Sequence, residues 1–439
     1  MRHPGKKPTV AALFFAVVIV TIPNLVSAEG LSSIYEQARS SDPQFQQDVA
    51  DLNAREELLP QAKAGLRPNA SLTSTFDAID NRKTDDRYRE LTYGISLRQP
   101  LYRYSRSRAV DQADARVNQA QAEFAFAEQQ LILRVAERYF AVLDAREALN
   151  AAEANLEAIQ RQLDQAEQRF EVGVIARTDV EEARARADLA RAERLQAEDD
   201  LASRREELRE LTNRAPAELN PVRSGISLTP PEPEESNAWR AQAEEENRQL
   251  AAARFAAEAA MKGIDIQRGG RLPTADLVAR YNRSREHGKT GFDTEANQLS
   301  AGVELSFPLY QGGEVSSSIR EAQFRYTEAR ESLEQTRRTV ARNAANAYRG
   351  VLTALERVRA LDQARVSTRT AVEATEAGFE VGTRTIVDVL NAQRELFNAE
   401  RDYEQARHAY LLNTLKLQQA AGTLTVADLE RVNSLLGQT

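Results

Sequence analysis

The chain contains no cysteine, and only three of its 439 residues are histidine. The lack of cysteine excludes disulfide bridges, thiolate metal sites, cysteine nucleophiles and a lipidated N-terminal cysteine. Aromatic residues make up only 6% of the chain, against 28% charged residues. Such a composition is typical of long helices rather than of a thick aromatic core. We therefore expect no catalytic residue, no cofactor and no metal site.

Long apolar runs are also scarce, because no stretch of 18 apolar residues follows residue 28. Any membrane span in the mature chain must then consist of β-strands. The first 28 residues are predicted to be a signal peptide. Three basic residues precede an apolar run over 10–20, and Val26-Ser27-Ala28 is a small-x-small cleavage pattern. The protein is therefore expected to be exported.

Acidic residues outnumber basic ones once this segment is removed. It contains three of the 58 basic residues and none of the 66 acidic ones, so the formal net charge changes from −8 to −11. A strongly acidic balance opposes binding to nucleic acid, which we do not expect as a partner.

An internal repeat organises the rest of the chain. Pro100-Leu101-Tyr102 recurs as Pro308-Leu309-Tyr310, and Phe170-Glu171-Val172-Gly173 recurs as Phe379-Glu380-Val381-Gly382. The predicted domains are a signal peptide, a first repeat, a linker, a second repeat and a C-terminal tail. Their boundaries are 1–28, 29–220, 221–236, 237–430 and 431–439. Pro230, Pro231 and Pro233 of the linker favour a surface segment.

Each repeat is expected to contain one long helix and two shorter ones. Apolar and small residues at steps of three and four predict coiled-coil helices. The predicted helices cover 30–63, 103–172 and 176–213, and then 237–269, 311–381 and 384–421. The long helix at 103–172 would measure about 105 Å, nearly the summed length of its two shorter companions. We therefore expect the short helices to stack end to end beside the long one.

Between the helices, the hydrophobic period falls to two. Leu91, Tyr93, Ile95 and Leu97 alternate with polar residues, and three further segments alternate near 72–76, 277–281 and 299–307. Two strands per repeat would be joined by charged loops near 80–90 and 284–296. Alternation alone also fits a half-buried hairpin in a soluble protein. In a membrane, four strands cannot close a barrel of about eight or more, so several chains would have to contribute.

The repeat and two of its motifs resemble the TolC-like outer-membrane efflux channels of Gram-negative bacteria. The motifs are Pro308-Leu309-Tyr310 followed by Gln311-Gly312-Gly313, and the turn FEVGTRTIVDVL at 379–390. The resemblance implies a mainly α fold with a β-barrel portion. Three protomers would form a 12-stranded transmembrane barrel in outer-membrane lipid and a long periplasmic tunnel of coiled-coil helices. The function implied is the exit duct of a tripartite efflux pump or type I secretion system. Its partners would be a periplasmic adaptor and an inner-membrane pump of the RND or ABC type.

The same resemblance implies a gate at the periplasmic tip, where each long helix turns into the next. Latch contacts would join Thr178 and Asp179 to Arg384, and Phe379 stands where the archetype has a latch tyrosine. Arg384 aligns internally with Ile175, so a basic partner exists in one repeat only.

A constriction ring would form at Asp388 and Asn391, the latter replacing a second aspartate of the archetype. The ring would then hold three charges instead of six. Asp388 also fits an ordinary carboxylate in the first turn of a helix, where the helix dipole favours negative charge.

Two other classes of protein stay open at this point. A periplasmic adaptor also has an export signal and long hairpins, but would carry one hairpin flanked by β-domains. An exported enzyme would need catalytic side chains, and His287 and His408 have no second histidine or nucleophile motif beside them. Both histidines are expected to be solvated.

Overall fold

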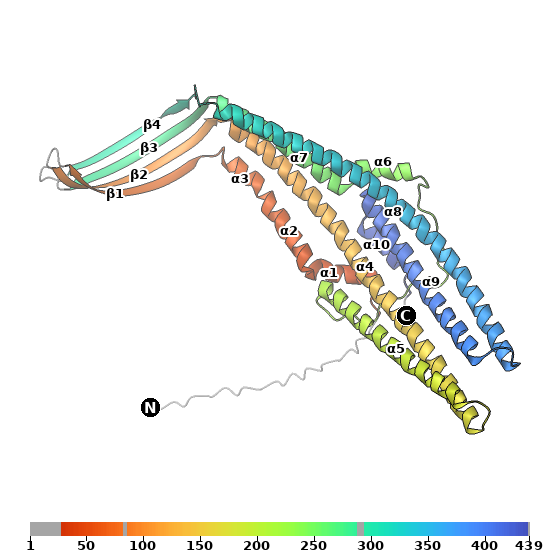
Figure 1. The fold of residues 1–439 in the computed structure, drawn as a ribbon. Helices are drawn as coiled ribbons and strands as arrows, with labels where there is room; N and C mark the ends of the chain where they lie inside the picture. Colours follow the sequence, from red (N-terminus) through yellow and green to blue (C-terminus); the bar gives the residue numbers. More distant parts are fainter. Residues whose placement is uncertain (1–27, 82–85, 288–293, 438–439) are drawn as a thin grey trace, which may run out of the picture.

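The computed structural model describes residues 28–81, 86–287 and 294–437, and residues 1–27 of the predicted signal peptide lie outside them. Long helices occupy one region of the molecule, and a single four-stranded sheet extends from one end of them (Figure 1). The elements follow the chain in this order: α1 (Leu31–Ser41), α2 (Pro43–Glu56), α3 (Leu58–Ala64), β1 (Asn69–Asn81), β2 (Asp86–Tyr102), α4 (Tyr104–Glu171), α5 (Arg177–Thr212), α6 (Ser236–Glu246), α7 (Arg248–Arg268), β3 (Thr274–His287), β4 (Thr294–Ser306), α8 (Glu314–Glu380), α9 (Ile386–Ala421) and α10 (Val426–Asn433).

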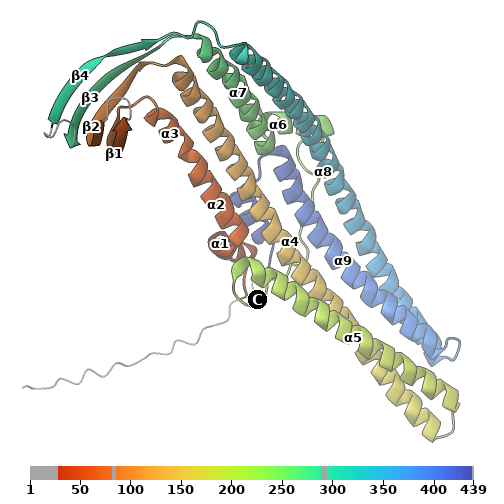
Figure 2. The same cartoon turned by 60° about the vertical axis from the view of Figure 1, so that its left-hand side comes forward.

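The two long helices have the predicted length and the predicted companions. α4 has 68 residues and α8 has 67, which corresponds to about 100 Å each. α5 lies against the lower part of α4 and α9 against α8, while α2, α3 and α7 contact the upper part of α4 (Figure 2). α7 also packs against α8, so it joins the two repeats. The end-to-end stacking of short helices beside a long one is confirmed.

The short N-terminal helices are more broken than predicted. The helix expected over 30–63 is divided into α1, α2 and α3. Asp42 caps α2 by accepting a hydrogen bond from the Gln44 N–H at 3.2 Å, and Pro43 occupies the first helical turn, where proline is tolerated.

The single helix expected over 237–269 is likewise wrong, because Asn247 separates α6 from α7. Its side chain accepts hydrogen bonds from the N–H groups of Gln249 and Leu250, and its amide donates to the Ala420 carbonyl. This tertiary contact fixes the break.

The sheet is antiparallel throughout, in the order β1-β2-β3-β4. β2 and β3 belong to different repeats, and their pairing places Ile95 opposite Tyr281. The strands are longer than predicted. The charged loops expected near 80–90 and 284–296 are mostly strand, and only 82–85 and 288–293 separate the strands. Those residues lie outside the described part of the chain.

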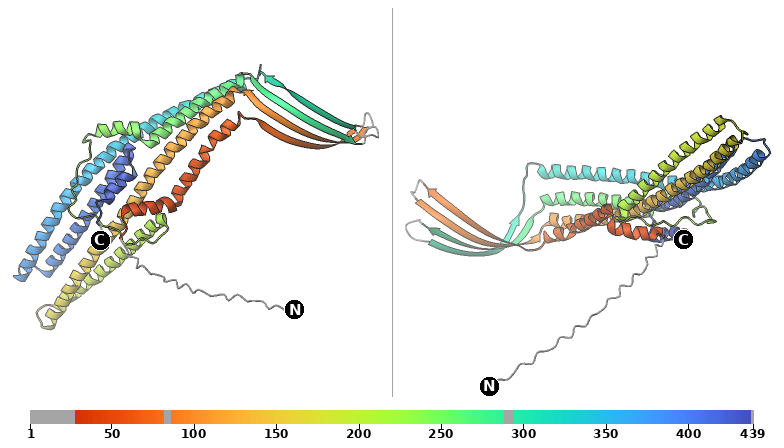
Figure 3. Two further views of the ribbon diagram at one scale, coloured as in Figure 1. Left: turned by 180° about the vertical axis from the view of Figure 1, so that it is seen from behind. Right: turned by 90° about the horizontal axis from the view of Figure 1, so that it is seen from below.

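A belt of packed segments surrounds the middle of the helices. It is made by α1, α10 and the segment 213–235, which lie against α4, α5 and α9 (Figure 3). All the buried side chains that α4 contributes to this core come from residues 131–143. Tyr139 is fully buried there, and its hydroxyl donates to the carbonyls of Glu29 and Asn220.

The predicted linker and tail are built into this belt. Val222 is buried and pairs with Leu436 in an antiparallel bridge, and the hydroxyl of Tyr410 donates to the Thr229 carbonyl. The linker is therefore not a simple surface segment. The expected boundary at 430/431 falls inside α10, a helix that was not predicted and that buries Leu429.

Within the three described ranges, no helix is both long enough and apolar enough to cross a membrane.

Candidate functional site

The tips of the two hairpins share one backbone turn. Gly173 and Gly382 have φ values of 79° and 78°, and the valine before each has φ −90° and ψ 4°. Only glycine adopts such a positive φ at little cost, so the repeated Val-Gly pair fixes the turn in both repeats. The two tips therefore differ in their side chains and not in their backbone path.

The first difference is the cap of the helix that follows the turn. Thr385 and Asp388 form a capping box at the start of α9. The Thr385 N–H and hydroxyl donate to Asp388 Oδ2 at 2.9 and 2.8 Å, and the Asp388 N–H donates to Thr385 Oγ1 at 3.2 Å. The N-cap of α5 is Ala176, which has no side-chain acceptor. Asp179 occupies the position equivalent to Asp388, and no such cap engages it.

The capping box also sets the charge of Asp388. Hydrogen bonds from the Thr385 backbone and hydroxyl, helped by the nearby Arg384 charge, hold the pKa of this carboxyl below its ordinary value. Asp388 is thus a carboxylate at neutral pH and is partly exposed. Asn391 follows on the same helix and is exposed. Asp388 and Asn391 both lie on α9, and Asp388 has the capping role expected of an ordinary first-turn carboxylate.

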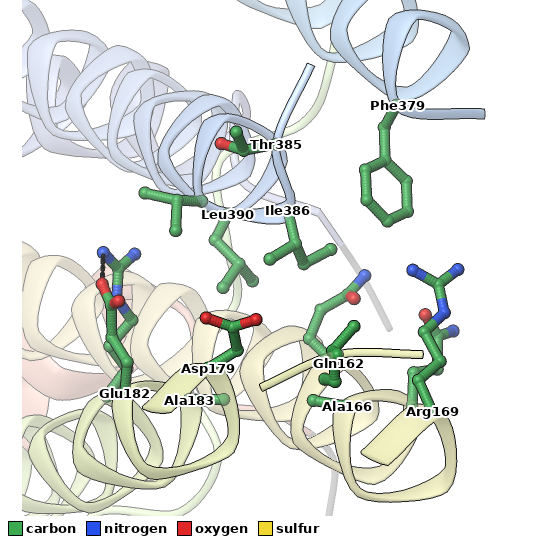
Figure 4. A pocket seen from close by; sticks show the side chains of 14 residues that line it. Gln162, Ala166, Arg169, Asp179, Glu182, Ala183, Phe379, Thr385, Ile386 and Leu390 are labelled. Carbon is green, nitrogen blue, oxygen red and sulfur yellow. Dashed lines mark hydrogen bonds and ion pairs between the residues drawn. The ribbon is translucent and has the colours of Figure 1, made fainter. Parts of the chain in front are cut away.

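A cleft of about 530 Å³ separates the two hairpins close to their tips. Asp179 of α5 points toward the start of α9, where Ile386 and Leu390 line the opposite wall (Figure 4). Deeper toward the tip, the Arg169 guanidinium lies over the Phe379 ring, 5.2 Å from its centroid. This cation–π contact joins α4 to α8 directly.

The structure does not bring all the predicted latch residues together within one chain. Asp179 and Phe379 line the cleft, whereas Thr178 and Arg384 are exposed and do not line it. In the described part of this chain no ion pair joins Arg384 to Asp179. The aliphatic stem of Arg384 instead lies so close to Gly378 that a Cβ added there would be 2.8 Å from Arg384 Cγ.

Arg169 is the residue of this site that sequence reasoning missed. Its internal counterpart is Gly378, just as the counterpart of Arg384 is Ile175. Arg169 and Arg384 therefore each lack a basic counterpart in the other repeat. The internal alignment that singled out Arg384 would also have found Arg169.

The expectation for the histidines is wrong in one case. His408 is only 3% exposed, and its Nδ1 lies 2.6 Å from Asp144 Oδ1 while its ring stacks on Phe140. It belongs to the belt and joins α9 to α4. His287 is exposed at the end of β3. Among the residues that the structure describes, no group of three or more His, Cys, Asp or Glu side chains could hold a metal ion.

These features define a class of protein. One face of the sheet is apolar and the other polar, its edge strands β1 and β4 have open outer sides within the chain, and two long hairpins extend away from it. Such a chain is one protomer of an oligomeric membrane channel with a helical extension.

The chain belongs to the outer membrane efflux protein family, whose model matches residues 34–214 and 239–423. It is 37% identical to the outer membrane protein TolC of Vibrio cholerae, over 96% of this chain and 97% of that protein. It is 29% identical to the alkaline protease secretion protein AprF of Pseudomonas aeruginosa, over 97% of this chain and 91% of that protein. The crystal structure of the channel protein CusC has the same fold, with a TM-score of 0.77 at 16% identity over 90% of this chain and 92% of that one.

The predicted family, fold class and location are confirmed. The protein is a homotrimeric outer-membrane channel whose protomers share one β-barrel, and its helices form a long periplasmic extension. It serves as an exit duct that pairs with periplasmic adaptors and inner-membrane pumps. The adaptor alternative is not supported.

Proposed function

We propose that this channel is a passive duct, with no catalytic step, that is gated by its two unlike hairpin tips. The observation that carries the proposal is the difference between Asp179 and Asp388. Two equivalent carboxylates stand on equivalent turns, one engaged in a helix cap and the other facing the cleft between the hairpins. A gate needs one rigid element and one contact that can be released.

The rigid element is the tip of the second hairpin. The capping box fixes the start of α9, and the lowered pKa keeps Asp388 charged. In a trimer, three such carboxylates would stand around the axis of the tunnel. A ring of this kind concentrates cations at the constriction, while Asn391 would add hydrogen-bonding groups but no charge.

The releasable contact is the latch. We propose that Arg384 pairs with Asp179 and Thr178 of an adjacent protomer in the closed channel, because no acidic side chain of its own chain forms an ion pair with it in the described residues. An arginine–carboxylate pair can be bidentate and directional, which suits a contact that must hold and then release. Within one chain, the contact between Arg169 and Phe379 would support the same closed arrangement.

Similarity to the alkaline protease secretion protein AprF supports a role in protein secretion beside efflux. Both cargoes would have to pass the same tip, so the gate would open by movement of whole hairpins.

The latch is tested by the Arg384→Ala variant in planar lipid bilayers. Three exposed contacts of about 0.5 kcal/mol each would shift the balance between closed and open states by about tenfold. We expect the resting conductance of the purified trimer to rise accordingly.

The matched control is Arg177→Ala, which removes an exposed arginine of the first hairpin. Arg177 Nε lies 3.7 Å from Oε1 of Glu181 on the same helix. The conductance of this variant should equal that of the parent protein. Unchanged conductance in Arg384→Ala would refute the latch.

A further inference from the structure

The two faces of the sheet carry opposite charge at the end farthest from the helices. On the apolar face, this end holds Arg87 and Arg89 of β2 and Arg283 and Arg285 of β3, where Arg285 stands opposite Leu91 and Arg283 opposite Tyr93. On the polar face at the same level, Asp77, Glu90 and Glu286 occupy paired positions across β1, β2 and β3. The strands thus direct arginines to one face and carboxylates to the other.

The apolar face is the outer face of the barrel, because it is the one that must contact lipid. Its exposed side chains include Leu72 on β1, Ile95 on β2, Tyr281 on β3 and Leu299 on β4, which stand opposite one another in the strand register. The four arginines share this face, so they also point outward and away from the channel lumen.

The height of the arginines can be estimated from the length of the apolar band. From Leu91 to Leu101, ten steps of about 3.4 Å on a strand tilted by about 45° project to roughly 24 Å along the membrane normal. Transmembrane barrels have an outward apolar band about 25 Å tall. Arg89 and Arg87 are the next two outward residues of β2, so they lie at the level of the lipid headgroups. Arg285 and Arg283 stand opposite Leu91 and Tyr93 at the upper edge of the band, from where their long side chains reach the headgroups.

Positive charge is in excess at this level. Arg87 lies 3.5 Å from Asp80, and Arg283 and Arg285 share Glu295 at 2.9 and 2.6 Å. Among the described residues at this end of the outward face, four arginines therefore face two acids. Counted over these described residues, the surplus is two positive charges in each protomer.

We propose that this cluster, Arg87, Arg89, Arg283 and Arg285, binds the phosphate groups of an anionic glycolipid in the outer leaflet of the outer membrane. The helices extend into the periplasm, so this end of the barrel lies in the outer leaflet. Guanidinium groups bind phosphate through paired hydrogen bonds, and the apolar side chains below them would contact the acyl chains. The outward position and the charge of the cluster match a lipid that is phosphorylated and acylated at the same time.

The test uses a variant that removes two of the four arginines and leaves each of the two acids paired with one arginine. In Arg89→Gln/Arg285→Gln, Arg87 still pairs with Asp80, and Arg283 still pairs with Glu295. Binding of diphosphorylated lipid A to the detergent-purified trimer is measured by native mass spectrometry. Each arginine near a membrane surface changes affinity by about fivefold, so the double variant should bind about 25-fold more weakly.

The control is Arg280→Gln on the same strand but on the inward face, where Glu304 keeps a second contact with Arg98 at 3.4 Å. It should bind lipid A as the parent protein does. Equal binding by the double variant and the parent would overturn the proposal.

A second measurement needs no variant. The parent trimer should bind dephosphorylated lipid A much more weakly than the diphosphorylated form, and millimolar inorganic phosphate should not displace the lipid. Equal binding of the two lipids would exclude recognition of phosphate. Full displacement by inorganic phosphate would show a simple anion site and would also overturn the proposal.

Discussion

The two hairpin tips have the same backbone and opposite chemistry. At the first tip, Val174 and Ile175 are apolar and Ala176 leaves the following helix uncapped. At the second, Thr383, Arg384 and Thr385 occupy the equivalent positions. The turn is therefore a shared scaffold, and substitutions in three consecutive residues make one tip apolar and the other polar and capped. A duplicated fold can in this way supply both halves of a contact between unlike surfaces.

The largest expected effect is on cation preference, and it should distinguish Asp388 from its equivalent Asp179. Asp388→Asn removes the three charges of the proposed ring, whereas Asp179→Asn removes three charges from the cleft. We expect Asp388→Asn to abolish cation preference and to weaken block by trivalent cations by about tenfold or more. Reversal potentials and block in planar bilayers measure both quantities. Asp179→Asn should retain the preference, and equal loss in the two variants would remove the proposed division of roles.

A second change makes the first tip like the second. Ala176→Thr supplies the missing cap, and the new hydroxyl and the backbone N–H would engage Asp179 as Thr385 engages Asp388. A cap worth about 1 kcal/mol outweighs a latch contact of about 0.5 kcal/mol at each of the three tips, so the resting conductance should rise by about tenfold, as in Arg384→Ala. Adding Arg384→Ala to this variant should have little further effect, because the same contact is already lost. Full additivity of the two changes would show that Asp179 is not the partner of Arg384.

A third change, Thr385→Ala, makes the second tip like the first. It is tested by the pH dependence of the cation preference. Because the pKa of Asp388 is lowered, its negative charge, and with it the cation preference of the channel, is complete above the ordinary carboxyl pKa. The charge is lost only as the pH falls through the lowered pKa. Cation preference should therefore stay constant from about pH 8 to about pH 5. Thr385→Ala removes the hydroxyl donor, so the pKa should rise and the preference should disappear at a higher pH than in the parent. An unchanged titration midpoint would contradict the role of the capping box.

The smallest effect concerns Phe379, whose ring lies under the Arg169 guanidinium. Phe379→Tyr keeps the ring under the guanidinium and adds a donor at the cleft, so the resting conductance should fall by about twofold. Phe379→Leu removes the cation–π contact, worth about 0.5–1 kcal/mol at an exposed site, and should raise the conductance. A rise in Phe379→Tyr would show that the archetype's latch does not transfer to this chain.

The sequence predicted the elements whose signal is local. The long helices and the four strands were visible because their periods of 3.6 and 2 persist over many residues. The break at Asn247 was not predictable in the same way, since one of its hydrogen bonds reaches Ala420 in another helix. The helix α10 did have a local signal, the Thr425 and Asp428 capping box, which was overlooked.

The candidate site was predicted only in part for a related reason. Gly382 and Asp388 could be assigned from the turn motif alone. The position of Asp179 in the cleft depends on how α5 faces α9, and the burial of His408 depends on Asp144, which is 264 residues away. Contacts between residues far apart in the chain produce no periodic pattern in a single sequence, so the sequence does not predict them.

The belt around the middle of the molecule has a mechanical consequence. α4 contains neither proline nor glycine over its 68 residues and is held by the belt at 131–143. The part of α4 below the belt is a stiff lever of about 28 residues, or about 42 Å. A rotation of only about 10° at this fulcrum would carry the tip through about 7 Å, while the part of α4 leading to the barrel is restrained by the belt. The segment that ties the two repeats together would thus serve as a fulcrum at which a small angular change becomes a large displacement of the tip.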